Sequence, residues 1–313
     1  MKKFIFAFFI CLLVSKFTFS QTVGEKYIWE FRDGTIIHGN FVKSESGNLY
    51  IIDDNGEEIY IPKVMIAQRH IATEENYKDG EYWFPNLHDT RYFFSPSAFG
   101  LEKGEGYYNN AYYMMWQFQY GITDNMSIGG GATILGFPAT VNLKYSDNIS
   151  DKLNYSFGYF YVGDLFEVTG NQRNILSMPY ALITKGSKEK NISLGLSYNF
   201  AKPLNDLINY ESGFRSQRFV LNVGAVSRLS RRFSFVFEGW FMNPENLVFM
   251  GGPGIRYFSK VKRITAKNGA GAKTVDFQIF IMSNGDGNVA LPMIGRSWSC
   301  LLYTSPSPRD GLL

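Results

Sequence analysis

The sequence predicts an all-β protein: an antiparallel transmembrane β-barrel of about twelve strands, with ten as the alternative count, preceded by a small β module. Three features of the chain support this fold class. Apolar and polar residues alternate with a period of two over most of residues 89–299, and aromatic residues make up 17% of the chain. The connections between these segments are alternately short and long. All three are typical of outer-membrane barrels.

Residues 1–20 have the features of a secretory signal peptide. Lys2 and Lys3 give a positive start, the stretch from Phe4 to Val14 is apolar, and small residues precede Gln21. The apolar stretch is too short to span a bilayer, so we expect the peptide to be removed.

Residues 21–66 predict a compact β module. Short segments in which apolar and polar residues alternate are separated by Asp33-Gly34 and Asn55-Gly56, and such dipeptides are strong signals for hairpin turns. Four or five such strands resemble an SH3-like fold, which serves as a packing unit or as a docking module for a periplasmic partner; the fold alone does not decide between them. Residues 67–88 lose the alternation and gather charge, and we interpret them as a linker.

From residue 89 onward the alternating segments have the length of tilted membrane strands, roughly nine to eleven residues. In Tyr112–Ile122 one face is apolar and aromatic, and the other carries small or neutral polar side chains. Asn191–Ala201 alternates most cleanly. Further strands are expected at residues 126–136, 139–146, 152–164, 174–186, 218–230, 233–241, 247–259, 274–283 and 289–298.

The connections predict an orientation, because outer-membrane barrels have short periplasmic turns and longer outer loops. If the short connections face the periplasm, Tyr112–Ile122 runs toward the periplasm. A strand that runs away from the periplasm must then precede it. Thr90–Ala98 is the candidate, with Phe99–Gly106 as its outer loop. The count is then twelve, with both ends of the barrel in the periplasm.

The last residues differ from the rest of the chain. The segment from Cys300 to Asp310, CLLYTSPSPRD, resembles the translation of a transposon-type sequencing adapter, so we expect the natural sequence to be interrupted near Ser299 and residues 300–313 to be an artefact. A C-terminal aromatic signal for the barrel-assembly machinery would then lie just beyond Trp298. With Cys11 in the signal peptide, the mature segment has no cysteine for disulfides, metal binding or nucleophilic catalysis.

The segments TRYFFSPSAFGLEKGEGYYNN and YGITDNMSIGGG, together with the N-terminal module, resemble a group of uncharacterised bacterial outer-membrane β-barrel proteins. The resemblance spans roughly residues 25 to 299. It implies an outer-membrane location, outer-membrane lipid as the surroundings and a periplasmic N-terminal module, but no reaction.

Few residues in the sequence are candidates for chemistry. The three histidines are His38, His70 and His88, and none lies between residues 89 and 299, so a Ser-His-Asp site cannot be assembled from barrel residues alone. No residues have metal-ligand spacing, and we expect no cofactor. The net charge of +3 is too small and too scattered for a nucleic-acid partner.

Three charged residues occupy positions that face inward if their strands are correctly phased. These candidates for the lumen are Arg218, Glu238 and Asp276. Charges inside a barrel can select solutes or can pair and close the lumen. Because small barrels fill with side chains, we favour a largely filled lumen with paired charges over an open pore.

The sequence therefore favours a passive channel or a structural component of the envelope, without a catalytic site. A barrel hydrolase that acts on outer-membrane lipid, with a base supplied from outside the barrel, is one alternative. A secreted soluble β protein is the other, although it would need charged exposed faces that these strands lack.

Overall fold

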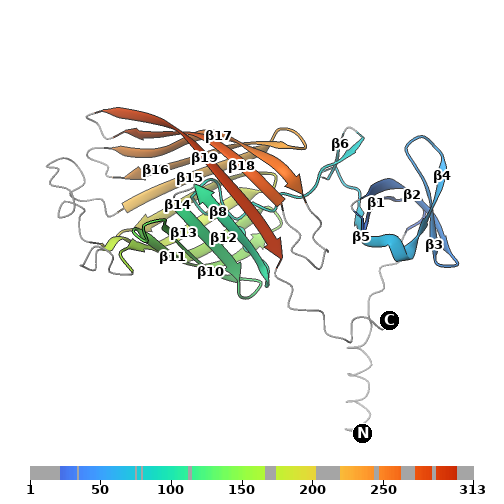
Figure 1. Cartoon of the computed structure of the whole chain (residues 1–313), viewed down its shortest axis with the longest axis horizontal. Coiled ribbons are helices and arrows are strands. Elements are labelled where there is room, and N and C mark those ends of the chain that lie inside the picture. Colours follow the sequence, from blue (N-terminus) through green and yellow to red (C-terminus); the bar gives the residue numbers. More distant parts are fainter. Residues whose placement is uncertain are drawn as a thin grey trace, which may run out of the picture. The chain divides into compact units, whose positions relative to one another are not determined.

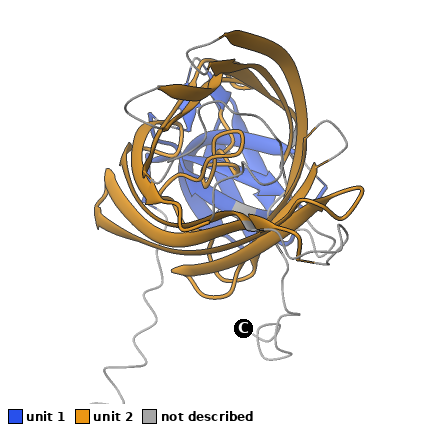
Figure 2. Ribbon diagram, turned by 90° about the vertical axis from the view of Figure 1, so that its left-hand side faces the viewer, with its two compact units in different colours: residues 1–82 blue, residues 83–313 orange. Residues whose placement is uncertain are grey.

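The computed structural model of the chain describes residues 22–33, 35–74, 76–78, 80–111, 115–165, 174–201, 219–242, 247–261, 272–283 and 287–301. The chain divides into two compact units, residues 1–82 and 83–313 (Figure 2). The expected signal peptide lies outside the described residues. In the part of the chain that the structure describes, no helix is long and apolar enough to cross a membrane.

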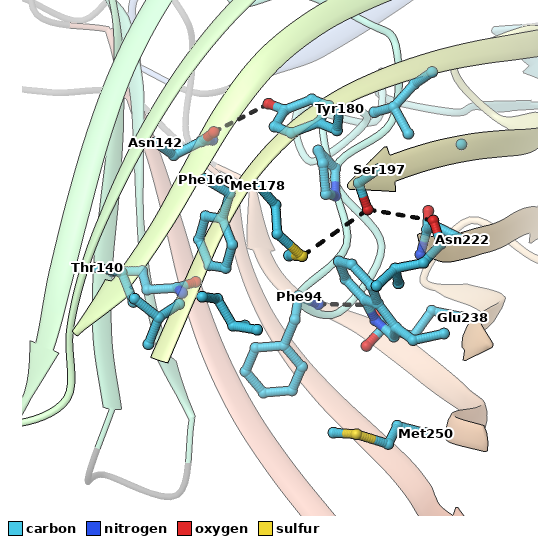
Figure 3. Close-up of a pocket in the computed structure, with 18 of the residues that line it drawn as sticks. Phe94, Thr140, Asn142, Phe160, Met178, Tyr180, Ser197, Asn222, Glu238 and Met250 are labelled. Atoms are coloured by element: carbon cyan, nitrogen blue, oxygen red, sulfur yellow. Dashed lines mark hydrogen bonds between the residues drawn. The ribbon is translucent and has the colours of Figure 1, made fainter. Parts of the chain in front are cut away.

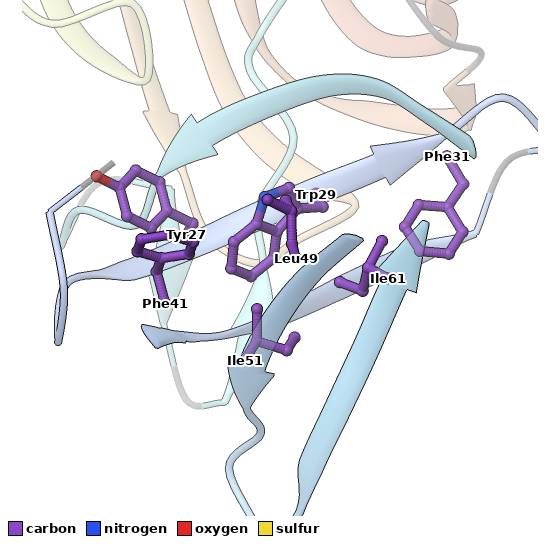
Figure 4. Packing of buried hydrophobic residues seen from close by; sticks show 7 residues of the cluster. All are labelled: Tyr27, Trp29, Phe31, Phe41, Leu49, Ile51 and Ile61. Atoms are coloured by element: carbon purple, nitrogen blue, oxygen red, sulfur yellow. The ribbon is translucent and has the colours of Figure 1, made fainter. Parts of the chain in front are cut away.

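The first unit contains an antiparallel five-stranded sheet in the order β4-β3-β2-β1-β5. Its elements are β1 (Lys26–Phe31), β2 (Ile36–Glu45), β3 (Asn48–Ile52), β4 (Glu58–Pro62), the 3-10 turn η1 (Lys63–Met65) and β5 (Ile66–Ile71), followed by the hairpin of β6 (Tyr77–Lys78) and β7 (Glu81–Tyr82). Alternate residues of the strands point to one face, where Trp29, Ile51 and Ile61 are almost fully buried (Figure 4). This cluster is the core of the unit.

One boundary of the first unit differs from the expected one. Residues 67–71, which we expected to belong to a linker, continue the sheet as β5, and Tyr27 pairs with Ile71 across β1 and β5. The sequence pattern of this strand was hard to recognise, because Gln68, Arg69 and His70 interrupt the alternation of apolar residues. Pairing with β1 satisfies the main-chain groups of this segment whatever its side chains are.

The second unit contains a closed barrel of twelve antiparallel strands (Figure 1), as the sequence predicted. The strands are β8 (Glu105–Ala111), β9 (Met115–Gly121), β10 (Met126–Thr133), β11 (Ala139–Ser150), β12 (Leu153–Gly163), β13 (Asn174–Gly186), β14 (Lys190–Tyr198), β15 (Phe219–Arg228), β16 (Phe233–Met242), β17 (Val248–Val261), β18 (Ala272–Ser283) and β19 (Asn288–Leu301). Pairing of β19 with β8, from Gly295↔Ala111 to Leu301↔Glu105, closes the barrel.

Alternation in the sequence becomes the two faces of the barrel wall. In β14 the residues Asn191, Ser193 and Ser197 are buried and point inward, whereas Ile192, Leu194 and Leu196 are more than half exposed and point outward. The neighbouring strands repeat this arrangement. The outer surface therefore consists mainly of aliphatic and aromatic side chains, and the inner surface of polar and small ones.

The first barrel strand was assigned wrongly from the sequence. Thr90–Ala98 is not a strand of the wall, and the first strand is β8, which begins at Glu105 inside the expected outer loop Phe99–Gly106. Residues 83–101 instead fold inside the ring of strands (Figure 2), and we call this segment the plug. The main-chain groups of this segment find their partners in Glu238, Arg256 and Lys144 of the wall, not in a neighbouring strand.

The end of the described chain joins the wall. Cys300 pairs with Gly106, and Leu301 pairs with Glu105. Residues 302–313, which contain most of the adapter-like segment, lie outside the described residues.

Candidate functional site

The barrel interior has two halves of different character. The short-turn end carries the connections at residues 122–125, 151–152, 187–189 and 229–232. Inward residues near this end are mostly polar, and the plug lies among them. Toward the opposite end, which we call the loop end, the inward residues are mostly apolar and surround a cavity of about 380 Å³.

The plug contains a tight turn that resembles a small hairpin. Arg91 and Pro96 form an isolated antiparallel bridge, the Tyr92 N–H donates to the Ser95 carbonyl over 2.8 Å, and the Ser97 N–H donates to the Thr90 carbonyl over 3.0 Å. These bonds satisfy the flanks of the turn but not its tip. The N–H groups of Phe93 and Phe94 at the tip need partners from the wall.

Glu238 on β16 supplies those partners. One carboxylate oxygen, Oε2, accepts hydrogen bonds from the N–H groups of Phe93, Phe94 and Ser95 at 3.0, 2.9 and 3.0 Å. Glu238 faces inward because β16 alternates, with Phe235 outward and Val236 inward. Successive N–H groups converging on one anion are a strong arrangement, since a hydrogen bond to a charged group contributes about 1.5–3 kcal/mol.

A second contact joins the plug to β17 and β18. Arg256 binds Asp276 through Nε and Nη2 at 2.9 and 3.0 Å, and its Nη1 donates to the His88 carbonyl at 3.1 Å. Its Nη2 also donates to the Tyr92 carbonyl. Arg91 of the plug approaches the same Asp276 at 3.7 Å, so one carboxylate lies between two guanidinium groups.

Lys144 on β11 holds the other side of the plug. Its Nζ donates to the carbonyls of Ser97 and Phe99 at 2.9 and 2.6 Å, and it lies 3.4 Å from the carbonyl of Thr90. Lys144 is 6% exposed, and the carbonyl oxygens replace the water that an ammonium group loses on burial.

Two aromatic side chains of the plug pack against glycines of the wall. A Cβ at Gly224 would lie 2.1 Å from the Tyr92 ring, and one at Gly254 would lie 2.7 Å from the Phe93 ring. Tyr92 also donates to Asn191 at 2.7 Å, and together with Phe93 it packs on Val236. The plug therefore combines polar anchors with close packing.

The chain enters the barrel at the short-turn end. The Asn86 N–H donates to Glu189 in the turn between β13 and β14 at 2.7 Å, and the same carboxylate accepts from Arg228 at 3.0 Å. Burial raises the pKa of Glu189 although Arg228 opposes this shift. In the same turn Lys188 binds Asp89 at 3.1 Å.

Figure 3 shows the cavity at the loop end and the side chains around it. Its wall contains five methionines together with aromatic and aliphatic side chains: Met115, Met178, Met242, Met250, Met293, Phe94, Phe160, Phe280, Trp240, Val162, Leu176 and Val220. Phe94 at the tip of the plug forms part of the floor. Among the described residues that line the cavity, Glu238 alone carries a formal charge.

The structure brings two of the three predicted lumen residues to the plug. Glu238 is fully buried and Asp276 is 5% exposed, and both point inward. Asp276 is paired with Arg256, whereas Glu238 accepts main-chain hydrogen bonds. Arg218 lies outside the described residues.

Sequence reasoning missed Arg91, Lys144 and Arg256, the three cations that bind main-chain carbonyls of the plug. A signal existed: Lys144 and Arg256 are lone charges at inward positions of strands that otherwise carry small or neutral residues there. Such charges need partners, and a segment inside the barrel can supply them.

The described residues contain no group of three His, Cys, Asp or Glu side chains that could hold a metal ion. His88 lies in the plug and is 1% exposed, and its carbonyl accepts from Arg256. His38 and His70 belong to β2 and β5 of the first unit.

No protein family model matches the chain, and no curated protein is similar to it in sequence. Among solved structures, the toluene transporter TbuX of Ralstonia pickettii superposes with a TM-score of 0.35 at 9% identity, over 90% of each chain. The outer membrane channel DcaP of Acinetobacter baumannii superposes with a TM-score of 0.30 at 10% identity, over 89% of this chain and 82% of that one. Superpositions at this level carry no argument about function.

Proposed function

We propose that this protein is an outer-membrane barrel that binds a small apolar molecule in its lumen and passes it toward the periplasm when the plug moves. The outward side chains support a membrane location. Ile192, Leu194 and Leu196 on one strand are each more than half exposed, and burying such side chains in hydrocarbon is favourable.

The observation that carries the proposal is the lining of the cavity. A water-filled pore is expected to have polar walls, yet most of the residues that line this half of the lumen are methionines, aromatics and aliphatic residues. Its volume of about 380 Å³ lies in the range of small-molecule sites. Methionine side chains adapt their shape to different apolar surfaces, so the cavity suits a class of molecules.

The plug supports binding followed by controlled release over a permanently open channel. Glu238 and Arg256 on the adjacent strands β16 and β17 hold it from one side of the wall, and Lys144 on β11 holds it from another. In the proposed orientation the short-turn end faces the periplasm, so the plug closes the inner half of the lumen while the cavity lies toward the outer end. A purely structural envelope role is the rival reading, since a firmly held plug also suits a barrel that never opens.

Binding of naphthalene to the full chain in lipid nanodiscs tests the proposal. Equilibrium dialysis against empty nanodiscs should reveal saturable binding, about one molecule per protein. Met178→Trp should abolish it, because the larger side chain fills the cavity that Met178 lines. The matched control is Met126→Trp, on the outer face of β10, where Met126 is 50% exposed; this variant should bind like the wild type. The proposal is wrong if the chain binds no more naphthalene than empty nanodiscs do, or if Met178→Trp binds as much as the wild type. The structural envelope role would then be the remaining explanation.

A further inference from the structure

The carboxylate of Glu238 lies at the boundary between the plug and the cavity. Glu238 belongs to the cavity wall and is fully buried. Its Oε2 takes all three N–H groups at the tip of the plug. Its other oxygen, Oε1, is buried without a hydrogen-bond partner among the described residues. The two oxygens of one side chain therefore have different roles.

An unsatisfied buried carboxylate oxygen is costly. Leaving a charged acceptor without a donor in a protein interior destabilises the fold by more than the roughly 1–3 kcal/mol lost at a neutral group. Most buried polar groups in folded proteins have a partner, so each exception needs an explanation, such as a bound ligand or a water molecule. Because Glu238 lines the cavity, a ligand in the lumen is within reach of this carboxylate.

Two polar residues of the cavity wall, Asn222 and Ser197, lie on the strands beside Glu238, while other polar lining residues, including Gln119, Thr140 and Asn142, lie on β9 and β11. Glu238, Asn222 and Ser197 lie on the adjacent strands β16, β15 and β14, and Figure 3 draws them on one side of the cavity with Phe160 and Thr140 opposite. Asn222 already accepts a hydrogen bond from Ser95 of the plug at 2.7 Å. The cavity is thus mostly apolar, with polar side chains on more than one side and an acceptor without a donor at Glu238.

We propose that Glu238 selects the ligand: its Oε1 accepts a hydrogen bond from a hydroxyl or ammonium group carried by a small, otherwise apolar molecule. This inference rests on the proposed function and narrows its substrate class. The apolar body of the ligand lies among Met178, Met250 and Phe280, and its polar end points toward the plug. A carboxylate on the ligand would be repelled by Glu238 and left without a donor there.

A matched probe series on the wild-type chain in nanodiscs tests the inference. The probes are naphthalene, 1-naphthalenemethanol, 1-naphthylmethylamine, which is protonated at pH 7, and 1-naphthoate, each corrected for partition into empty nanodiscs. The alcohol or the ammonium should bind about tenfold more tightly than naphthalene, the gain expected for one hydrogen bond to a charged group. Naphthoate should bind more weakly than naphthalene. Of the alcohol and the ammonium, the probe whose affinity rises more above that of naphthalene identifies the donor that Glu238 prefers.

Variants locate the effect. Glu238→Gln should remove the gain of the donor-bearing probes, so that the alcohol and the ammonium bind this variant no more tightly than naphthalene does. Thr140→Val, on the opposite wall, should keep the gain. If Glu238→Gln does not fold, the wild-type series alone still decides.

The two hypotheses fail in different ways. Absence of naphthalene binding overturns the proposed function. Saturable naphthalene binding, with alcohol and ammonium binding no more tightly, overturns the role of Glu238 and leaves Oε1 to a water molecule.

Discussion

Arg256 and Asp276 are paired residues of β17 and β18, and their buried ion pair also holds the plug. Asp276→Asn would leave Arg256 without its charge partner and would weaken the approach of Arg91. We expect a loss of about 3–5 kcal/mol, because a buried charge without a partner is strongly destabilising. Urea unfolding in detergent would measure the loss.

The double replacement Arg256→Met and Asp276→Leu separates the ion pair from the plug contact. Replacing both partners by apolar residues should cost less than Asp276→Asn, since no lone charge stays buried. It also removes the bonds from Arg256 to the carbonyls of His88 and Tyr92, so planar bilayers should record openings that the wild type lacks. Asp151→Asn, in an exposed turn, serves as the control. Wild-type stability in Asp276→Asn would show that the pair is dispensable.

Gly224 and Tyr92 give a test of plug packing. Gly224→Ala places a methyl group where the Tyr92 ring lies, so we expect a loss of about 1–3 kcal/mol from overpacking. Combined with Tyr92→Ala, the same change should cost less than the sum of the two single losses, because the clash is gone. Gly287→Ala is the control, since a Cβ there meets nothing within 4 Å. Strict additivity in thermal unfolding would contradict the contact.

Leu194 tests whether the outer face meets lipid. It is 57% exposed near the middle of β14, and Leu194→Arg should cost about 2–4 kcal/mol of folding free energy in a bilayer. Tyr60 on β4 of the first unit is 65% exposed, and Tyr60→Arg should have little effect. The measurement is the folded fraction in lipid vesicles, read from the different gel migration of unboiled and boiled samples. Equal folding of the two variants would argue against a transmembrane barrel.

The first unit should respond to acid through Asp54. Hydrogen bonds from Lys26 and then Tyr77 hold the pKa of Asp54 below its usual value of 3.8. A lowered pKa in the folded state means that the stabilisation is present above the unfolded value and is lost as the pH falls through the folded value. The tie between Asp54 and the β6–β7 hairpin should therefore weaken only below about pH 3.8.

Cleavage within that hairpin measures this effect. Pepsin should cut the wild-type chain there more slowly than Asp54→Asn at pH 4.5, and the two rates should converge toward pH 2.5. Because both chains are compared at each pH, the pH dependence of pepsin itself cancels. A rate ratio that stays constant over this range would exclude the role assigned to Asp54.

Much of the barrel could be predicted because its physics is local. In β14 the alternation of Leu194 with Ser193 and Gly195 predicts which face of the strand lies on the outer surface of the barrel and which face lies in the lumen. The inward positions of Glu238 and Asp276 follow from the same rule. The count of twelve came instead from the lengths of the connections, and it is right although its first strand was placed at the wrong residues. Turn chemistry at Asn55-Gly56 likewise predicts a hairpin, and Gly56 adopts the positive φ of 85° that such turns need.

The plug could not be predicted in this way, because its partners are distant in the sequence. Phe93 and Glu238 are separated by 145 positions, and no periodicity links them. The segment Thr90–Ala98 has the aromatic content of a strand, so a local pattern cannot distinguish a place in the wall from one inside it. Pro96 does not distinguish them either, because β13, β17 and β19 of the wall also contain prolines, so the cations at inward positions were the only signal. The cavity needed the structure as well, since it depends on how far the plug reaches into the barrel.

Tyr92 and Phe93 of the plug pack on the wall by their side chains, whereas at Phe94 a main-chain group is held, because Glu238 accepts a hydrogen bond from the Phe94 N–H over 2.9 Å. Such a main-chain contact is indifferent to the side chain carried at that position. Phe94 can therefore be exchanged without disturbing closure, although it forms the floor of the cavity. A substitution at this one position could therefore change which ligand the cavity binds, while the hydrogen bonds that hold the plug stay the same.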